Sequence, residues 1–146
     1  MTQRQFPLKT LQERAVALQD DAGRQVALAQ ARLVEAQRKG ELLESYRSQY
    51  QQRLQEAGAA GTTIRNVQDL SAFIARIDEA LRQQRGEIEY LQALWDTARA
   101  QWLDRRSDRE ALDVLEERYA QREEQRARRV EQKAQDETAS RRAPDA

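Results

Sequence analysis

The side chains with the clearest potential for chemistry are carboxylates, which occur as the adjacent pairs Glu116–Glu117 and Glu123–Glu124. Two neighbouring carboxyl groups can act as general acid and base when their environments differ. Here the pairs alternate with arginines in a polar stretch, which is typical of a solvated helix face. The sequence has no histidine and no cysteine, so imidazole bases, thiolate nucleophiles and metal ligands of either type are excluded. We therefore expect no enzymatic activity, no cofactor and no metal site.

The elements that carry these residues are expected to be long helices. Leu, Ile, Val and Phe number only 27 of 146 residues, whereas Ala, Glu, Lys, Leu and Arg number 78, the composition of coiled coils. The 25 basic and 25 acidic residues balance, which argues against a general nucleic-acid binder. We recognise no signal peptide and no apolar run of transmembrane length, and so expect a cytoplasmic protein without a membrane span.

A first helix is predicted over residues 7–57. Pro7 suits the first helical turn, where its missing N–H is no loss. From there apolar residues recur about every 3.5 residues, the heptad period of a helix that packs on a partner helix. This stripe is Leu8, Leu11, Ala15, Leu18, Ala22, Val26, Ala29, Leu33, Ala36, Gly40, Leu43, Tyr46, Tyr50, Leu54 and Ala57.

A bend at residues 58–66 separates this helix from a second one, predicted over 67–130. Gly58 and Gly61 interrupt the stripe, and turn-forming threonines follow them. The second stripe alternates steps of three and four residues through Val67, Leu70, Ile74, Ile77, Leu81, Gln84, Ile88, Leu91, Trp95, Ala98 and Trp102. Residues 131–146 carry no stripe, so we expect a flexible, disordered tail.

The two stripes predict an all-α fold, a long antiparallel two-helix coiled-coil hairpin. If the bend centres near residue 62, opposing residue numbers add to about 124 in the packed coiled coil. Large side chains then meet small ones, which favours an intramolecular hairpin over a parallel homodimer. The expected pairs are Trp95 with Ala29, Trp102 with Ala22, Leu43 with Leu81, and Tyr50 with Ile74.

Two stretches of surface are candidates for recognition. Near the bend, Tyr46 and Tyr50 lie one turn apart on one helix, and Phe73 adds an aromatic ring on the other. This strip is either a wide seam that covers itself or a docking surface with aromatic hot spots. The arginine-rich stretch 104–129 is either a solvated, salt-bridged helix or a helix that completes its packing inside another protein.

Several segments resemble the flagellar export protein FliJ family. They are "FPLKTLQERA" at residues 6–15, "LLESYRSQYQQRL" at 42–54, Ala60–Gly61 in the bend, and "DLSAFIARIDEALRQQRGEI" at 69–88. The resemblance implies a non-enzymatic stalk similar to the rotary ATPase gamma subunit, monomeric when free. Such proteins are thought to bind the hexameric flagellar export ATPase and promote its assembly and activity.

The resemblance also implies partners and contact residues. The family contacts the export gate protein at the cytoplasmic face of the inner membrane, and it binds export chaperones at positions that we cannot map. The implied gate contacts are Leu43, Tyr46, Tyr50, Phe73, Ile77, Ala80 and Gln84, the last being His in some members. The implied ATPase contacts are Leu8, Leu11, Leu112, Leu115, Tyr119, Arg122 and Arg126.

Two other functions remain open from the sequence. One is the equivalent stalk of a virulence type III secretion system, which neighbouring genes would distinguish from the flagellar one. The other is a structural coiled coil that self-associates, which light scattering would separate from a monomer of 17.0 kDa.

Overall fold

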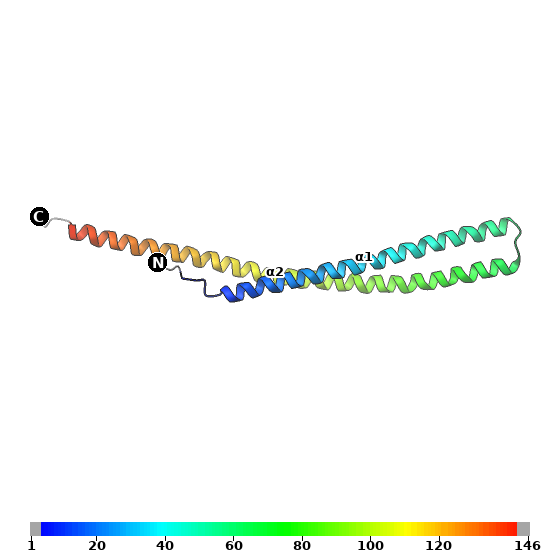
Figure 1. The fold of residues 1–146 in the computed structure, drawn as a ribbon, viewed down its shortest axis with the longest axis horizontal. Helices are drawn as coiled ribbons and strands as arrows, with labels where there is room; N and C mark the ends of the chain where they lie inside the picture. The colour runs from blue at the N-terminus through cyan, green and yellow to red at the C-terminus, as the bar shows by residue number, and fades with distance from the viewer. Residues whose placement is uncertain (1–3, 143–146) are drawn as a thin grey trace. The chain divides into compact units, whose positions relative to one another are not determined.

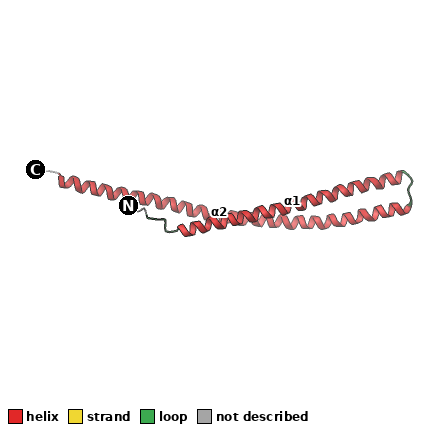
Figure 2. Ribbon diagram, in the orientation of Figure 1, coloured by secondary structure: helices red, strands yellow, loops and turns green. Residues whose placement is uncertain are grey.

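Two long α-helices make up nearly all of residues 4–142, the part of the chain that the computed structural model describes. Helix α1 spans Lys9–Ala59 and helix α2 spans Ile64–Arg142 (Figures 1 and 2). No strand occurs between residues 4 and 142. The all-α class predicted from the heptad stripes is confirmed.

The helices form two compact units. The bend unit is Ala22–Trp102, which contains the turn between α1 and α2. The terminal unit combines the chain up to Asp21 with the chain from Leu103 onward. Each unit pairs part of α1 with part of α2, and each is described separately below.

The bend is built from hydrogen bonds that end one helix and begin the next. Gly61 has a φ of 71°, a left-handed conformation that glycine adopts at little cost. The N–H of Thr62 reaches back to the carbonyl of Ala57 at 3.2 Å, the six-residue bond of a Schellman motif. Thr63 then caps α2, since its Oγ1 accepts a hydrogen bond from the N–H of Asn66 at 3.3 Å.

The apolar core lies entirely in the bend unit. All six buried hydrophobic residues of the described chain fall between positions 33 and 91, and Leu33, Ala36 and Leu91 form one cluster against which Ile88 and Trp95 pack. Every position of the predicted stripe from Val67 to Trp102 is buried or partly buried. This line of facing residues is called the seam. The buried set is Leu33, Ala36, Ile74, Ile77, Leu81 and Leu91.

Contacts across the seam confirm the antiparallel pairing in the bend unit. Trp102 was predicted to face Ala22 and lies against the next residue, Gly23. The indole Nε1 is 3.5 Å from where a Cβ on Gly23 would be. Nearer the bend, the rings of Tyr50 and Phe73 have centroids 4.3 Å apart. The predicted opposition of large and small side chains therefore holds within about one residue at Trp102.

Two positions of the first stripe were predicted wrongly. Leu11 and Tyr46 are exposed, at 52% and 44%, and the seam instead takes the next residues, Gln12 and Arg47. The heptad spacing alone does not decide between two neighbouring residues for a seam position, and the less polar residue of each pair was therefore predicted. Arg47 is tolerated in the seam because its side chain is only partly buried and its guanidinium pairs with the carboxylate of Asp78.

Helix α2 continues beyond its predicted end. The prediction placed the end at residue 130 and a flexible tail after it, whereas α2 runs to Arg142. Residues 131–142 have no apolar stripe, but they lack glycine and proline and are rich in helix-forming Glu, Gln, Lys, Arg and Ala. Residues 143–146, the remainder of the predicted tail, lie outside the described residues.

Gly86 is a position where one added methyl group should stabilise the protein. It lies inside α2, and a Cβ there would meet no atom within 4 Å. We expect Gly86→Ala to raise the free energy of unfolding by about 1 kcal/mol, because alanine is the better helix former. A thermal melt followed by circular dichroism should rise by roughly 2–4 °C. Gly61→Ala is the matched control and should lower the melt, since its φ of 71° disfavours any Cβ. Equal shifts in both variants would contradict the prediction.

Candidate interaction surfaces

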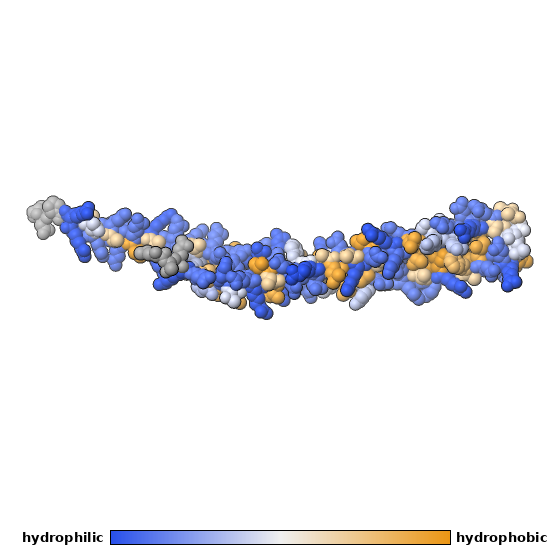
Figure 3. Space-filling model, viewed as in Figure 1, coloured by the Kyte–Doolittle hydropathy of each residue, from blue (hydrophilic) through white to orange (hydrophobic). Residues whose placement is uncertain are grey.

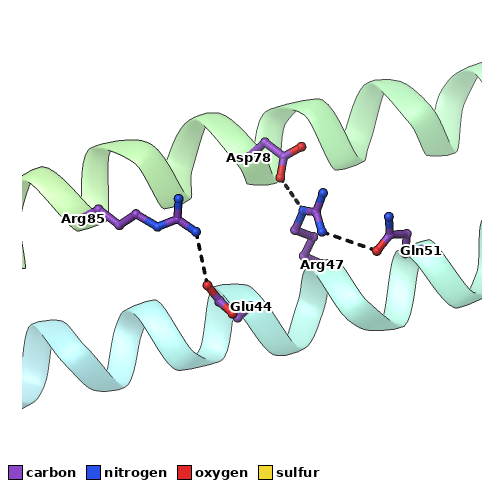
Figure 4. Close-up of polar contacts among 5 residues, drawn as sticks. All are labelled: Glu44, Arg47, Gln51, Asp78 and Arg85. Carbon is purple, nitrogen blue, oxygen red and sulfur yellow. Dashed lines mark hydrogen bonds and ion pairs between the residues drawn. The ribbon is translucent and has the colours of Figure 1, made fainter.

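One side of the seam near the bend is closed by polar contacts within the chain. Arg47 of α1 pairs with Asp78 of α2 and also donates a hydrogen bond to Gln51 at 3.4 Å. One turn away, Arg85 of α2 pairs with Glu44 of α1 at 3.4 Å. Figure 4 shows these side chains reaching across the two helices toward one another. Solvent-exposed pairs of this kind stabilise by roughly 0–1 kcal/mol each, so they mainly satisfy charge on this side.

Gln84 is held by the same region. Its Nε2 donates a hydrogen bond to the backbone carbonyl of Ala36 at 2.8 Å, in a groove of ≈ 600 Å³ that Gly40 and Leu81 also line. A Cβ on Gly40 would lie 3.8 Å from the Cγ of Gln84, an ordinary van der Waals distance. The predicted gate contact Gln84 is therefore partly buried and already engaged by the chain.

The other side of the seam is apolar and aromatic. Seam residues of a heptad come in pairs that are three residues apart. The residue just before such a pair and the residue just after it lie on opposite sides of the interface. Phe73 precedes the seam residue Ile74, and Tyr46 precedes Arg47, so both lie opposite the ion pairs. Phe73 is 40% exposed and stacks on Tyr50, whose other neighbour is the guanidinium of Arg53, 4.8 Å from the ring centroid.

This surface is called the bend strip and is formed by Leu42, Tyr46, Tyr50 and Phe73. Leu42 is 54% exposed, the highest value in the group. Figure 3 shows apolar surface gathered over both helices toward the bend, in contrast to the charged surface elsewhere on that face. Exposed aromatic and aliphatic side chains that adjoin one another are typical of protein-binding sites.

The predicted gate residues occupy three environments. Tyr46 and Phe73 are exposed, whereas Ile77 is only 6% exposed and lies in the seam. The partly buried members are Leu43, Tyr50, Ala80 and Gln84. Ile77 therefore lies in the seam beneath the surface and offers almost no area to a partner. Arg53 was missed from the sequence, because only the contact with Tyr50 identifies it.

In the terminal unit the seam mixes polar and apolar side chains. Its partly buried aliphatic residues include Leu8, Ala15, Leu18 and Leu112. Gln12 donates a hydrogen bond to Asp113 at 2.8 Å, and Arg109 donates one to Gln19 at 3.1 Å. Arg109 also lies 3.7 Å from the carboxylate of Asp113. None of the described residues in this unit is fully buried. The two helices here are therefore joined by polar contacts and partly buried apolar side chains, without a buried core.

Aromatic contacts join the N-terminal segment to α2. The rings of Phe6 and Tyr119 have centroids 5.7 Å apart at an interplanar angle of 58°. The hydroxyl of Tyr119 donates a hydrogen bond of 3.5 Å to the backbone carbonyl of Arg4. Leu8 and Leu112 are partly buried in the same unit.

The predicted ATPase contacts therefore divide into covered and open residues. Leu8, Leu112 and Tyr119 are partly buried within the terminal unit. Leu11 and Leu115 are exposed, and exposed Val114, next to Leu115, was missed because it lies off the stripe. The predicted arginines Arg122 and Arg126 are exposed, and Arg126 pairs with Glu123 at 3.4 Å.

The carboxylates that could have carried chemistry lie on helix surfaces. Glu123 and Glu124 pair with Arg126 and Arg128, the latter pair at 2.7 Å. Within residues 4–142, no three His, Cys, Asp or Glu side chains gather as a metal site would require. In the same part of the chain, neither helix has a stretch long and apolar enough to cross a membrane.

Comparisons with known proteins place the chain in a family. The family model described as "Flagellar FliJ protein" matches residues 4–145. No curated protein matches the sequence. Among solved structures, a proposed YscO homolog from Chlamydia trachomatis is similar, with a TM-score of 0.51, 20% identity and 94% of each chain covered. At this identity the structural likeness indicates a shared fold.

Proposed function

The chain belongs to the flagellar FliJ protein family, and we propose on that basis that it is a non-enzymatic stalk of the flagellar type III export apparatus. In this role it binds the hexameric export ATPase, promotes its assembly and activity, and links it to the export gate in the inner membrane. The observation that carries the proposal is the family match, which extends over residues 4–145. Free in the cytoplasm the protein is a monomer, and at the flagellar base it is peripheral to the membrane.

The ATPase is proposed to bind the terminal unit. Leu11, Val114 and Leu115 are exposed there, and a helix with uncovered apolar residues gains free energy when a partner covers them. The neighbouring arginines add cations that can pair with acidic groups of a partner. The gate is proposed to bind the bend strip, where Tyr46 and Phe73 are the exposed aromatics. Export chaperones are further proposed partners, with no residues assigned to them.

The ATPase role can be tested with purified components. Adding the chain to a flagellar export ATPase should increase ring formation, measured by sedimentation, and ATP turnover, measured by phosphate release. The double variant Leu11→Ala, Leu115→Ala should lose most of this stimulation, because it removes exposed side chains from the proposed contact. Leu103→Ala, another exposed leucine of the same unit, is the control and should stimulate like the unmodified chain.

Two results would contradict the proposal. One is an ATPase whose ring formation and turnover do not change with the added chain. The other is equal stimulation by the double variant, which would move the contact away from these leucines. A virulence-type secretion ATPase in a parallel reaction separates the flagellar role from its nearest rival, since only the cognate enzyme should respond at low stalk concentration.

A further inference from the structure

The terminal unit differs from the bend unit in what holds its two helices together. The bend unit contains all six buried hydrophobic side chains of the described chain. The terminal unit has no buried side chain among its described residues, and it places Gln12, Gln19 and Arg109 between its helices beside apolar residues that are only partly buried.

This difference predicts unequal resistance to local opening. Water can replace an exposed side-chain hydrogen bond, so each such bond contributes little to holding the helices together. Water cannot replace the burial of a leucine or isoleucine side chain, which stabilises the folded state more strongly. Segments with few buried apolar contacts open at free energies well below that of global unfolding. The terminal unit is such a segment.

The N-terminal part of this unit covers residues that the family resemblance implies as ATPase contacts. Phe6 packs on Tyr119, and the backbone of Arg4 accepts the Tyr119 hydroxyl. Leu112, also implied as an ATPase contact, is only partly exposed. A partner that contacts the full predicted set must therefore displace the segment that covers Tyr119.

We propose that residues 4–21 form a releasable strap, which separates from residues 109–119 of α2 while the bend unit stays folded. With the strap closed, the hydroxyl of Tyr119 is hydrogen-bonded and its ring is packed within the chain. With the strap open, Leu112 and Tyr119 are free to pack against the ATPase, and Leu8 and Phe6 of the strap are freed as well. The opening itself does not depend on the proposed function; the identity of the partner that captures the open state rests on it.

Hydrogen exchange of the full-length chain tests the opening without any partner. Residues 13–21 and 47–55 are suitable windows, because they lie equally far from the two ends of α1 and fray to a similar degree. We expect amides in 13–21 to exchange at least about 100-fold faster than those in 47–55, which corresponds to about 2.8 kcal/mol. Equal protection in the two windows would overturn the proposal.

A seam variant tests the cause. The double variant Gln19→Leu with Arg109→Leu removes both the donor and the acceptor of one hydrogen bond, so neither group of that bond is left without its partner. It replaces this polar contact of the strap with an apolar one. Exchange in 13–21 should slow about 10-fold, by about 1.4 kcal/mol. The matched control, Arg118→Leu with Gln121→Leu, makes the same replacements at exposed positions of the same unit and should leave exchange in 13–21 unchanged. Equal slowing in both variants would overturn the assignment of the strap to this seam.

The partner is tested with the same seam variant. If the ATPase binds the open state, a tenfold smaller open population should raise the stalk concentration for half-maximal stimulation about tenfold. If the seam variant stimulates the ATPase half-maximally at the same concentration as the unmodified chain, although its hydrogen exchange is slowed, the regulatory role of the strap is overturned. An unmodified chain that never stimulates the ATPase would instead overturn the proposed function, and the exchange result would stand on its own.

Discussion

Replacing both exposed aromatics of the bend strip, as Tyr46→Ala with Phe73→Ala, is expected to weaken binding to the export gate about 100-fold. Aromatic hot spots typically contribute more than 1 kcal/mol each, and about 2.8 kcal/mol in total corresponds to that factor. Both rings are exposed, so they can be covered by a partner without rearrangement of the hairpin. Binding can be measured by titration against the purified cytoplasmic part of the gate, and swimming motility should fall in parallel.

The same variant should remain folded. Phe73 contributes a stacking contact with Tyr50, and its loss costs about 0.5–1.5 kcal/mol of stability, which circular dichroism would register as a small shift of the melt. Ile77 is deliberately left intact, because it is a core residue at 6% exposure. The control is Tyr90→Ala with Leu94→Ala, two exposed residues of the bend unit outside the strip. If the control weakens gate binding as strongly, the strip is not the contact surface.

The largest effect on stability is expected at Leu33, which is 4% exposed and central to the cluster with Ala36 and Leu91. Leu33→Ala should lower the free energy of unfolding by about 2–3 kcal/mol, near the lower end for buried leucines, because a two-helix seam can partly relax around the gap. The melting temperature should fall by roughly 4–12 °C. Urea titration with a circular dichroism readout measures the free energy directly.

Leu28→Ala is the matched control for this substitution. It makes the same change five residues earlier in α1, at a side chain that is 48% exposed. We expect a change within about 0.5 kcal/mol, since exposed apolar residues lose little surface burial. A loss at Leu28 equal to that at Leu33 would contradict the assignment of the seam.

The fold was predictable because one repeated pattern determines it. The second stripe alternates steps of three and four from Val67 to Trp102 without error, and each position faces the partner helix. The bend was equally readable, because only glycine takes the φ of 71° at Gly61 without strain. Large residues opposite small ones then fixed the register, as Trp102 against Gly23 illustrates.

The surfaces were less predictable because a shift of one residue changes which side of a helix a side chain occupies. Tyr46 and Arg47 were interchanged for this reason, and the ion pair of Arg47 with Asp78 appears only when the correct residue is in the seam. The polar contacts of the terminal unit's seam were also missed. Arg109 lies in the arginine-rich stretch 104–129, and its partner Gln19 is next to a predicted apolar position and depends on the exact rotation of α1.

The last nineteen residues of α2 differ from the rest of the chain in what stabilises their helical structure. Every residue from Glu124 to Arg142 is exposed, and the ion pair of Arg128 with Glu124 joins side chains of the same turn. Such pairs add only about 0.2–0.5 kcal/mol to a helix. The helix content of this stretch is therefore set by a local helix–coil equilibrium, which weakens gradually on warming and without a sharp midpoint. Substitutions there should lengthen or shorten the helix while leaving the cooperative transition of the hairpin where it is.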